Sequence, residues 1–167
     1  ALEFGVPLTH RDTHRGAVPS RPDLIEVYTK LAGEFDLPVL MLREFDEQRK
    51  REYPALVVEQ AGKLVTKLEQ EGFPLLDSIA QFYEGESYQE RRDQYVKTLQ
   101  NLQPGVNQLI IHCGYADDEL KAITTSANRR DGDRAIFMEP QMAKLIESLD
   151  IELITWKQFR EMKTSAE

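Results

Sequence analysis

The chain has 167 residues, of which 41% are hydrophobic and 30% charged, so it is long enough for about one domain with a buried core. Acidic residues outnumber basic ones by 29 to 21, which argues against a nucleic-acid or membrane-surface partner because both require a basic face. The chain contains no apolar run of membrane-spanning length. Its single cysteine excludes an internal disulfide and fits a reducing, cytoplasmic compartment.

The first informative segment, residues 8–14, is predicted to be a strand. Because side chains alternate across a strand, His10, Asp12 and His14 would share one face. Such side chains can bind a metal ion or transfer protons, although a solvated polar edge strand would carry them too. The chain has only three histidines. The third, His112, ends another predicted strand, which favours a site shared by all three.

Helical and strand patterns then alternate along the chain. Strands are expected at 8–14, 37–42, 73–78, 106–111 and 151–155, and helices at 22–33, 54–71, 88–102, 117–123 and 140–149, with a short final helix from Trp156. The charged segment 46–52 is predicted to be a connection, Glu90–Asp93 a solvated helix face, and 126–134 a loop. This order favours an α/β fold with mostly parallel strands wrapped by helices. Five strands are few for a closed barrel, so an open or partial one is expected.

Helical spacing also predicts which side chains face the core. The inward positions are Leu24, Val27, Tyr28 and Leu31 in the first helix, Val57, Ala61, Leu64, Val65 and Leu68 in the second, Tyr88, Tyr95, Val96, Leu99 and Leu102 in the third, and Met142, Leu145, Ile146 and Leu149 in the fifth.

The stretch from Pro104 to Leu120 is the most distinctive. A short apolar strand stops at His112, and catalytic or ligand-binding groups gather beyond the carboxyl ends of strands in helix-covered sheets. His112 is therefore either a core histidine satisfied by a local hydrogen bond or a site residue, and this stretch alone leaves the two alternatives even. Acidic residues 117–119 stand where a helix begins, which suits the helix dipole without a catalytic role. Cys113, as a strand neighbour, should point away from His112, which disfavours a Cys–His nucleophilic pair.

Three segments carry a family resemblance. Residues 5–16, Gly-Val-Pro-Leu-Thr-His-Arg-Asp-Thr-His-Arg-Gly, resemble a signature of the YdjC/ChbG-like carbohydrate deacetylases. The stretch 104–120 is similar to a second motif of that family. Arg130-Asp131-Gly132-Asp133, followed by Ile151–Trp156, is similar to its C-terminal pattern. The similarity covers nearly all of the chain, in the right order.

The resemblance implies a metal-dependent hydrolase on a distorted, TIM-barrel-like (β/α) barrel, which removes N-acetyl groups from amino-sugar oligosaccharides such as diacetylchitobiose. It implies a divalent cation, magnesium or zinc, with His14 and His112 as matched ligands. Asp12 and His10 are candidate catalytic residues, expected to contact the substrate or, as Asp12 could, to hold a metal-binding histidine by a hydrogen bond. Arg130 and Asp133 match residues near the pocket, and Arg130 is taken as a candidate catalytic residue. Two imidazole ligands favour zinc or a similar transition metal over magnesium.

The Asp-Asp motif that this family carries on its first strand has no counterpart here. We therefore expect residues 1–162 to form one domain that corresponds to the C-terminal two-thirds of the family domain, with a frayed tail at 163–167. The expected partner is a small amino sugar or oligosaccharide, with homo-oligomerisation left open. Two alternatives remain: a sugar-binding module without turnover, and another metal-dependent sugar enzyme such as an isomerase.

Overall fold

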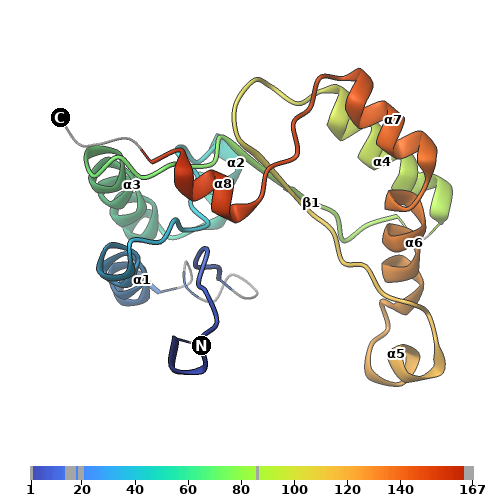
Figure 1. Ribbon diagram of the computed structural model, residues 1–167, viewed down its shortest axis with the longest axis horizontal. Coiled ribbons are helices and arrows are strands. Elements are labelled where there is room, and N and C mark those ends of the chain that lie inside the picture. The colour runs from blue at the N-terminus through green and yellow to red at the C-terminus, as the bar shows by residue number, and fades with distance from the viewer. Residues whose placement is uncertain (1, 14–17, 19–20, 86, 164–167) are drawn as a thin grey trace. The chain divides into compact units, whose positions relative to one another are not determined.

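The computed structural model describes residues 2–13, 18, 21–85 and 87–163 (Figure 1). It is a mixed α/β protein, which confirms the expected class at that level. The chain divides into two compact units: unit 1 comprises Ala1–Asp77 with Ile154–Glu167, and unit 2 comprises Ser78–Leu153. None of the described helices is long and apolar enough to cross a membrane.

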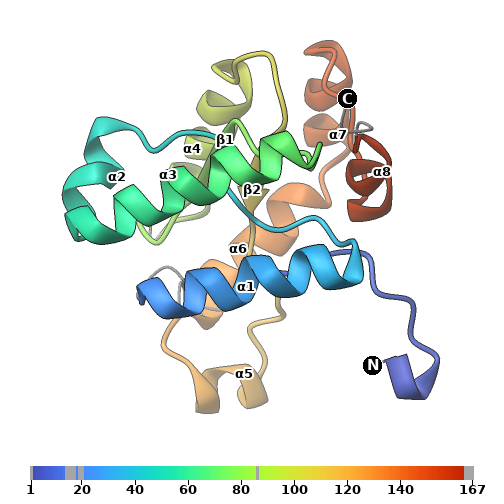
Figure 2. The same ribbon diagram turned by 90° about the vertical axis from the view of Figure 1, so that its left-hand side faces the viewer.

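Unit 1 is mainly helical. Its elements are the 3₁₀ turn η1 (Leu2–Phe4), α1 (Pro22–Phe35), α2 (Glu47–Glu52), α3 (Ala55–Gln70) and α8 (Trp156–Glu161). Helices α1 and α3 lie side by side (Figures 1 and 2). The segment 46–52, predicted to be a connection, mostly forms α2. That prediction was wrong because a run of charged and polar side chains hides helical periodicity without preventing a short helix.

The core of unit 1 lies between α1 and α3. All five predicted inward residues of α3 are buried. In α1 the buried stripe runs through Ile25, Tyr28 and Ala32, whereas Val27, predicted inward, is 53% exposed. Two stripes one residue apart both fit a period of 3.6, and packing against α3 buries the one that holds Ile25 and Ala32.

The predicted strands of unit 1 are reduced to isolated parallel bridges, Arg11 with Val39 and Leu42 with Leu76. Tyr28 links the first two segments: its hydroxyl donates to the Arg11 carbonyl at 2.8 Å and accepts from the Leu40 amide at 3.2 Å. Successive extended segments thus pair in parallel in chain order, as consecutive βα units do.

Unit 2 contains β1 (Ser78–Gln81), β2 (Asn107–Ile110), α4 (Tyr88–Gln100), α5 (Asp118–Ile123), α6 (Ala127–Phe137) and α7 (Pro140–Ser148). The two strands pair in parallel, with Gln81 opposite Ile110, and form the two-stranded sheet of the described residues. The strand expected at 73–78 therefore begins only at Ser78, and the one expected at 106–111 is confirmed in its central residues.

Helix starts in unit 2 follow local chemistry. Ser87 and Glu90 form a capping box at α4, each side chain accepting from the other's backbone N–H. Asp117 caps α5 by accepting from the Leu120 amide at 2.8 Å, which confirms a structural role for the acidic run at this helix start.

The core of unit 2 is formed where α4 packs on α6 and α6 on α7. Its buried residues are Tyr95, Leu99, Ile136 and Met142, with Val96, Leu102, Leu145, Ile146 and Leu149 packed against them. Three predictions were wrong here. Segment 126–134 forms most of α6 rather than a loop, residues 151–155 form no strand, and Tyr88 is 43% exposed. The polar sequence of α6 concealed a face on which Ala127, Asp133 and Ile136 are buried.

Candidate functional site

A buried ion pair organises unit 2. Arg91 of α4 and Asp133 of α6 are 2% and 1% exposed. The Asp133 Oδ1 atom accepts from Arg91 Nη2 at 2.5 Å and from Arg91 Nε at 2.9 Å. The buried Tyr95 hydroxyl donates to the same oxygen at 2.7 Å. Arg91 was predicted to lie on a solvated face. That prediction was wrong because the charge of Arg91 is satisfied inside the protein by Asp133.

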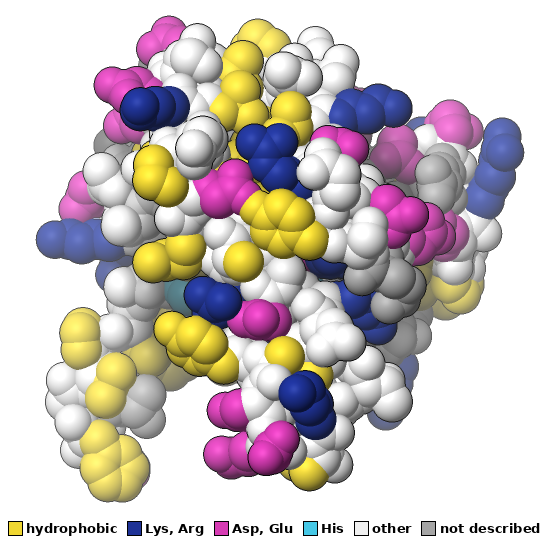
Figure 3. Space-filling view, turned by 90° about the vertical axis from the view of Figure 1, so that its right-hand side faces the viewer, with side chains coloured by type: hydrophobic (Ala, Val, Ile, Leu, Met, Phe, Trp, Pro, Cys, Tyr) yellow, Lys and Arg dark blue, Asp and Glu magenta, His cyan; other side chains and the backbone are white. Residues whose placement is uncertain are grey.

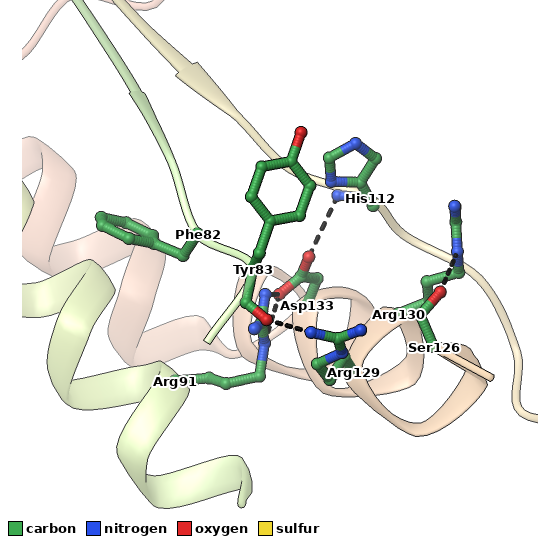
Figure 4. Close-up of a pocket in the computed structure, with 8 residues that line it drawn as sticks. All are labelled: Phe82, Tyr83, Arg91, His112, Ser126, Arg129, Arg130 and Asp133. Carbon is green, nitrogen blue, oxygen red and sulfur yellow. Dashed lines mark hydrogen bonds and ion pairs between the residues drawn. The ribbon is translucent and has the colours of Figure 1, made fainter. Parts of the chain in front are cut away.

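The second oxygen of Asp133 holds the chain at His112. Its Oδ2 atom accepts from the His112 backbone amide at 3.0 Å (Figure 4). Arg91 also donates to the Glu84 carbonyl at 2.7 Å. The ion pair therefore connects α4 and α6 to the chain segments that follow β1 and β2.

The protonation states of this network follow from burial and charge. Burial acts to lower the pKa of Arg91, but the hydrogen bonds and charge of Asp133 outweigh it and raise that pKa. Burial raises the pKa of Tyr95, and the Asp133 carboxylate raises it further. Arg91 is thus a permanent cation and Tyr95 a neutral donor, and both hold the carboxylate in place.

A pocket of about 120 Å³ opens beside this network (Figure 4). It is lined by Phe82, Tyr83, Arg91, His112, Ser126, Arg129, Arg130 and Asp133. The structure therefore brings together His112 from one motif of the family resemblance and Arg130 and Asp133 from another.

The polar wall of the pocket comes from the start of α6. Arg130 Nε donates to the Ser126 hydroxyl at 3.1 Å, and Arg129 donates to the Tyr83 carbonyl. Within the described part of the chain, neither arginine forms an ion pair with a carboxylate. Tyr83 is 66% exposed and its ring centroid lies 6.3 Å from that of His112. The pocket thus offers guanidinium donors, an imidazole and an accessible aromatic face.

The residues after His112 are positioned by close packing on α6. The Gly114 amide donates to the Arg130 carbonyl at 3.2 Å, and a Cβ atom at Gly114 would meet the Leu120 side chain at 3.1 Å. Cys113 is exposed. Partial desolvation and the Asp133 charge raise the pKa of its thiol, the opposite of what activates a nucleophilic cysteine.

The N-terminal candidates belong to unit 1. The His10 ring stacks on Trp156, with ring centroids 4.3 Å apart and planes 4° apart, and its Nδ1 lies 3.0 Å from the Thr9 hydroxyl. Asp12 is exposed and accepts from the Thr13 amide at 2.6 Å. His14 lies outside the described residues. A site shared by all these residues stays a prediction.

His10 should make stability depend on pH. Desolvation lowers the pKa of His10 below 6.5, with Asp12 partly opposing it. Because the unfolded chain then binds a proton more readily than the folded one, we expect the free energy of unfolding to fall as pH decreases from about 7 to 5. In His10→Phe, which can keep a ring against Trp156, this fall should be smaller; urea denaturation at several pH values measures it. If the free energy of unfolding fell equally with pH in both proteins, His10 would not be the group responsible.

The described residues do not by themselves fit a metal centre. No group of three or more His, Cys, Asp or Glu side chains among them is arranged to hold a metal ion. The family resemblance implies His14 and His112 as metal ligands, and of these two only His112 is among the described residues. Its Nε2 atom lies 3.2 Å from the amide nitrogen of Gln81.

Several residues of the site were not predicted: Gln81, Tyr83, Arg91, Ser126 and Arg129. A signal existed for one of them. Arg91 precedes the buried Tyr95 and Leu99 at intervals of four residues, so an arginine occupies the core-facing stripe of a helix. That position favours a buried ion pair with a partner elsewhere in the chain.

Basic and acidic side chains are interspersed on the face of the molecule seen in Figure 3, with hydrophobic side chains between them. On this face the basic side chains do not gather into one continuous patch.

Comparisons with known proteins gave a family match, a related sequence and a similar fold. A family model described as YdjC-like protein matches residues 1–148. A carbohydrate deacetylase from Thermoanaerobacter pseudethanolicus is 24% identical over 156 residues, which are 93% of this chain and 54% of that protein. A crystal structure from Enterococcus faecalis, described as a cellobiose-phosphate cleavage protein, has a similar fold, with a TM-score of 0.65 and 16% identity over 94% of this chain and 55% of that one. The chain spans about half the length of both relatives.

Proposed function

The chain belongs to the YdjC-like protein family, and we propose on this basis that it removes N-acetyl groups from amino-sugar oligosaccharides, with diacetylchitobiose as the model substrate. The observation that carries the proposal is the meeting of His112, Arg130 and Asp133 in one pocket. The deacetylase activity named for the 24%-identical relative supports the reaction type.

The pocket chemistry suits a sugar amide. Sugar rings present apolar faces and many hydroxyl groups, so they bind where an aromatic ring stands beside hydrogen-bond donors. Tyr83 offers such a ring, and the guanidinium groups of Arg129 and Arg130 offer donors. A guanidinium can also stabilise the negative charge that develops on an amide oxygen during hydrolysis.

His112 is the proposed acid–base or ligand group of the reaction. It is half-buried at the carboxyl end of β2, and its backbone is held by Asp133. General acid–base catalysis by a positioned histidine contributes about 10²- to 10⁴-fold to a rate. Asp133 is fully engaged by its four hydrogen bonds, so its proposed role is to position His112.

A divalent cation, magnesium or zinc, is part of the proposal, with His14 and His112 among its ligands. Such a cation polarises a carbonyl and lowers the pKa of bound water. A complete (β/α) barrel belongs to the proposal in the same way. It is supported by the parallel pairing of successive extended segments.

Acetate release tests the function. We expect the 167-residue chain to release acetate from N,N′-diacetylchitobiose when magnesium or zinc is present, and to stop when a chelator is added. The fully deacetylated disaccharide should yield no acetate and serves as the substrate control. An absence of acetate with either metal would contradict the proposed activity for this chain.

The same experiment separates the alternatives. Binding of the disaccharide that persists with chelator and without turnover would indicate a sugar-binding module. Turnover of an unacetylated sugar without acetate would indicate another sugar enzyme, such as an isomerase.

A further inference from the structure

Arg129 and Arg130 give the pocket of unit 2 more positive than negative charge. Both side chains are half-buried near the start of α6 and line the pocket (Figure 4). Among its described lining residues the pocket has one carboxylate, Asp133, and Arg91 already neutralises it. The two other guanidinium charges therefore have no carboxylate of their own there. Because the whole chain has a formal net charge of −8, a basic composition does not explain this excess.

The hydrogen-bond donors of these two side chains are also mostly unused within the part of the chain that is described. A guanidinium carries five N–H donors. Arg129 donates to the Tyr83 carbonyl, and Arg130 donates to the Ser126 hydroxyl. Guanidinium groups pair most strongly with oxyanions, through charge-assisted and often bidentate hydrogen bonds. A negatively charged oxygen ligand is therefore the partner that satisfies them best.

The size of the pocket restricts such a ligand to a few heavy atoms. The volume of the pocket is about 120 Å³, whereas an engineered cavity of about 150 Å³ in another protein binds one benzene molecule. Ligands of drug size, which a disaccharide matches, occupy pockets of about 300–1,000 Å³. The pocket therefore accommodates an acetyl group or a small anion, and the sugar rings of an oligosaccharide would extend beyond it.

We propose that Arg129 and Arg130 bind the carboxylate of a small organic acid, and that this acid is the acetate released by the reaction. The choice of acetate rests on the proposed function. In that reaction the amide C–N bond breaks and water supplies the second oxygen of the carboxylate. Both protons of the water end on the sugar nitrogen, which becomes an ammonium group. A neutral acetyl group thus becomes an anion beside two cations.

The pocket should therefore distinguish acetate from a neutral molecule of the same shape. Acetamide is such a molecule, because it replaces one carboxylate oxygen by an NH₂ group and carries no charge. Hydrogen bonds to a charged acceptor are about twice as strong as those between neutral groups. We expect acetate to bind with a dissociation constant of about 10 mM or below, which is within reach of so small a ligand, and acetamide to bind about tenfold more weakly.

Nuclear magnetic resonance of the ¹⁵N-labelled 167-residue chain, without added divalent cations, tests the proposal. The Nε–H signals of Arg129 and Arg130 are followed while sodium acetate replaces sodium chloride at constant ionic strength. Both signals should shift and reach saturation. A shift that does not saturate, or acetamide binding as tightly as acetate, overturns the proposal. Inorganic phosphate that binds about tenfold more tightly than acetate would indicate a phosphate site and would overturn it too.

Arginine variants provide the second arm. In Arg129→Gln and in Arg130→Gln, the affinity for acetate should fall about tenfold. Arg134→Gln is the matched control on the same helix, because Arg134 pairs with Asp131 at 2.7 Å, packs on the Tyr115 ring and does not line the pocket. It should leave the affinity unchanged. Wild-type affinity in both Arg129→Gln and Arg130→Gln overturns the proposal. Should these variants not fold, the titrations of the wild-type chain decide alone.

The two proposals fail separately. If acetate binds to both arginines but the chain releases none from the disaccharide, the deacetylase function is wrong and the carboxylate site stands, with another acid as its ligand. If the chain releases acetate but the arginine signals show no saturable binding, the deacetylase function stands and the carboxylate site is wrong.

Discussion

Replacing Arg91 with methionine should lower the free energy of unfolding by about 3–5 kcal/mol. The substitution keeps an unbranched side chain in the helix but leaves the Asp133 carboxylate, which is 1% exposed, without its charge partner. It also removes the donor to the Glu84 carbonyl. The Tyr95 hydroxyl and the His112 amide would remain as partners of Asp133, and two neutral donors do not replace a guanidinium. Chemical denaturation of the 167-residue chain measures the effect.

Arg92→Met provides the matched control on the same helix. Arg92 Nε pairs with Glu139 Oε2 at 3.1 Å, but the two side chains are 30% and 21% exposed, so water can solvate the remaining carboxylate. We expect a loss of about 1 kcal/mol or less. Equal losses for the two variants would show that burial of the Arg91–Asp133 pair does not set its importance.

Substituting His112 with alanine should reduce acetate release by about 10²-fold or more, with little change in the free energy of unfolding. His112 is half-buried at the end of a strand rather than in the apolar core. Its backbone amide can still donate to Asp133, so the network that organises unit 2 should survive the substitution. Rates measured at saturating and at low disaccharide concentration separate a loss of turnover from a loss of binding.

The neighbouring Cys113→Ala is the control for this effect. Cys113 is exposed and its thiol has a raised pKa, so neither catalysis nor folding should depend on it. An unchanged rate in His112→Ala, together with an unchanged rate in Cys113→Ala, would remove His112 from the proposed mechanism.

Sequence patterns predicted a helix and its buried face well only where a single arrangement fitted the pattern. Helix α3 was predicted residue by residue because five apolar side chains at helical spacing can be buried in only one way. In α1, two overlapping stripes fitted the same period, and contact with α3 decided between them. Helix α6 was missed because its polar residues, which are typical of a loop, include an aspartate that is buried only when Arg91 is present to pair with it.

For the site, the end of a predicted strand singled out His112 as one of two alternatives, and the family resemblance singled out Arg130 and Asp133. Their pairing partners could not be recognised in that way. Arg91 and Asp133 are 42 residues apart, and Gln81 and His112 are 31 apart.

Local chemistry along the chain was sufficient for the α/β class and most helix positions, since these depend on periodicity and caps. The identity of the groups that hold His112 required the folded chain. A buried charge is stable only beside its partner, and Arg91 meets Asp133 only when α4 packs on α6.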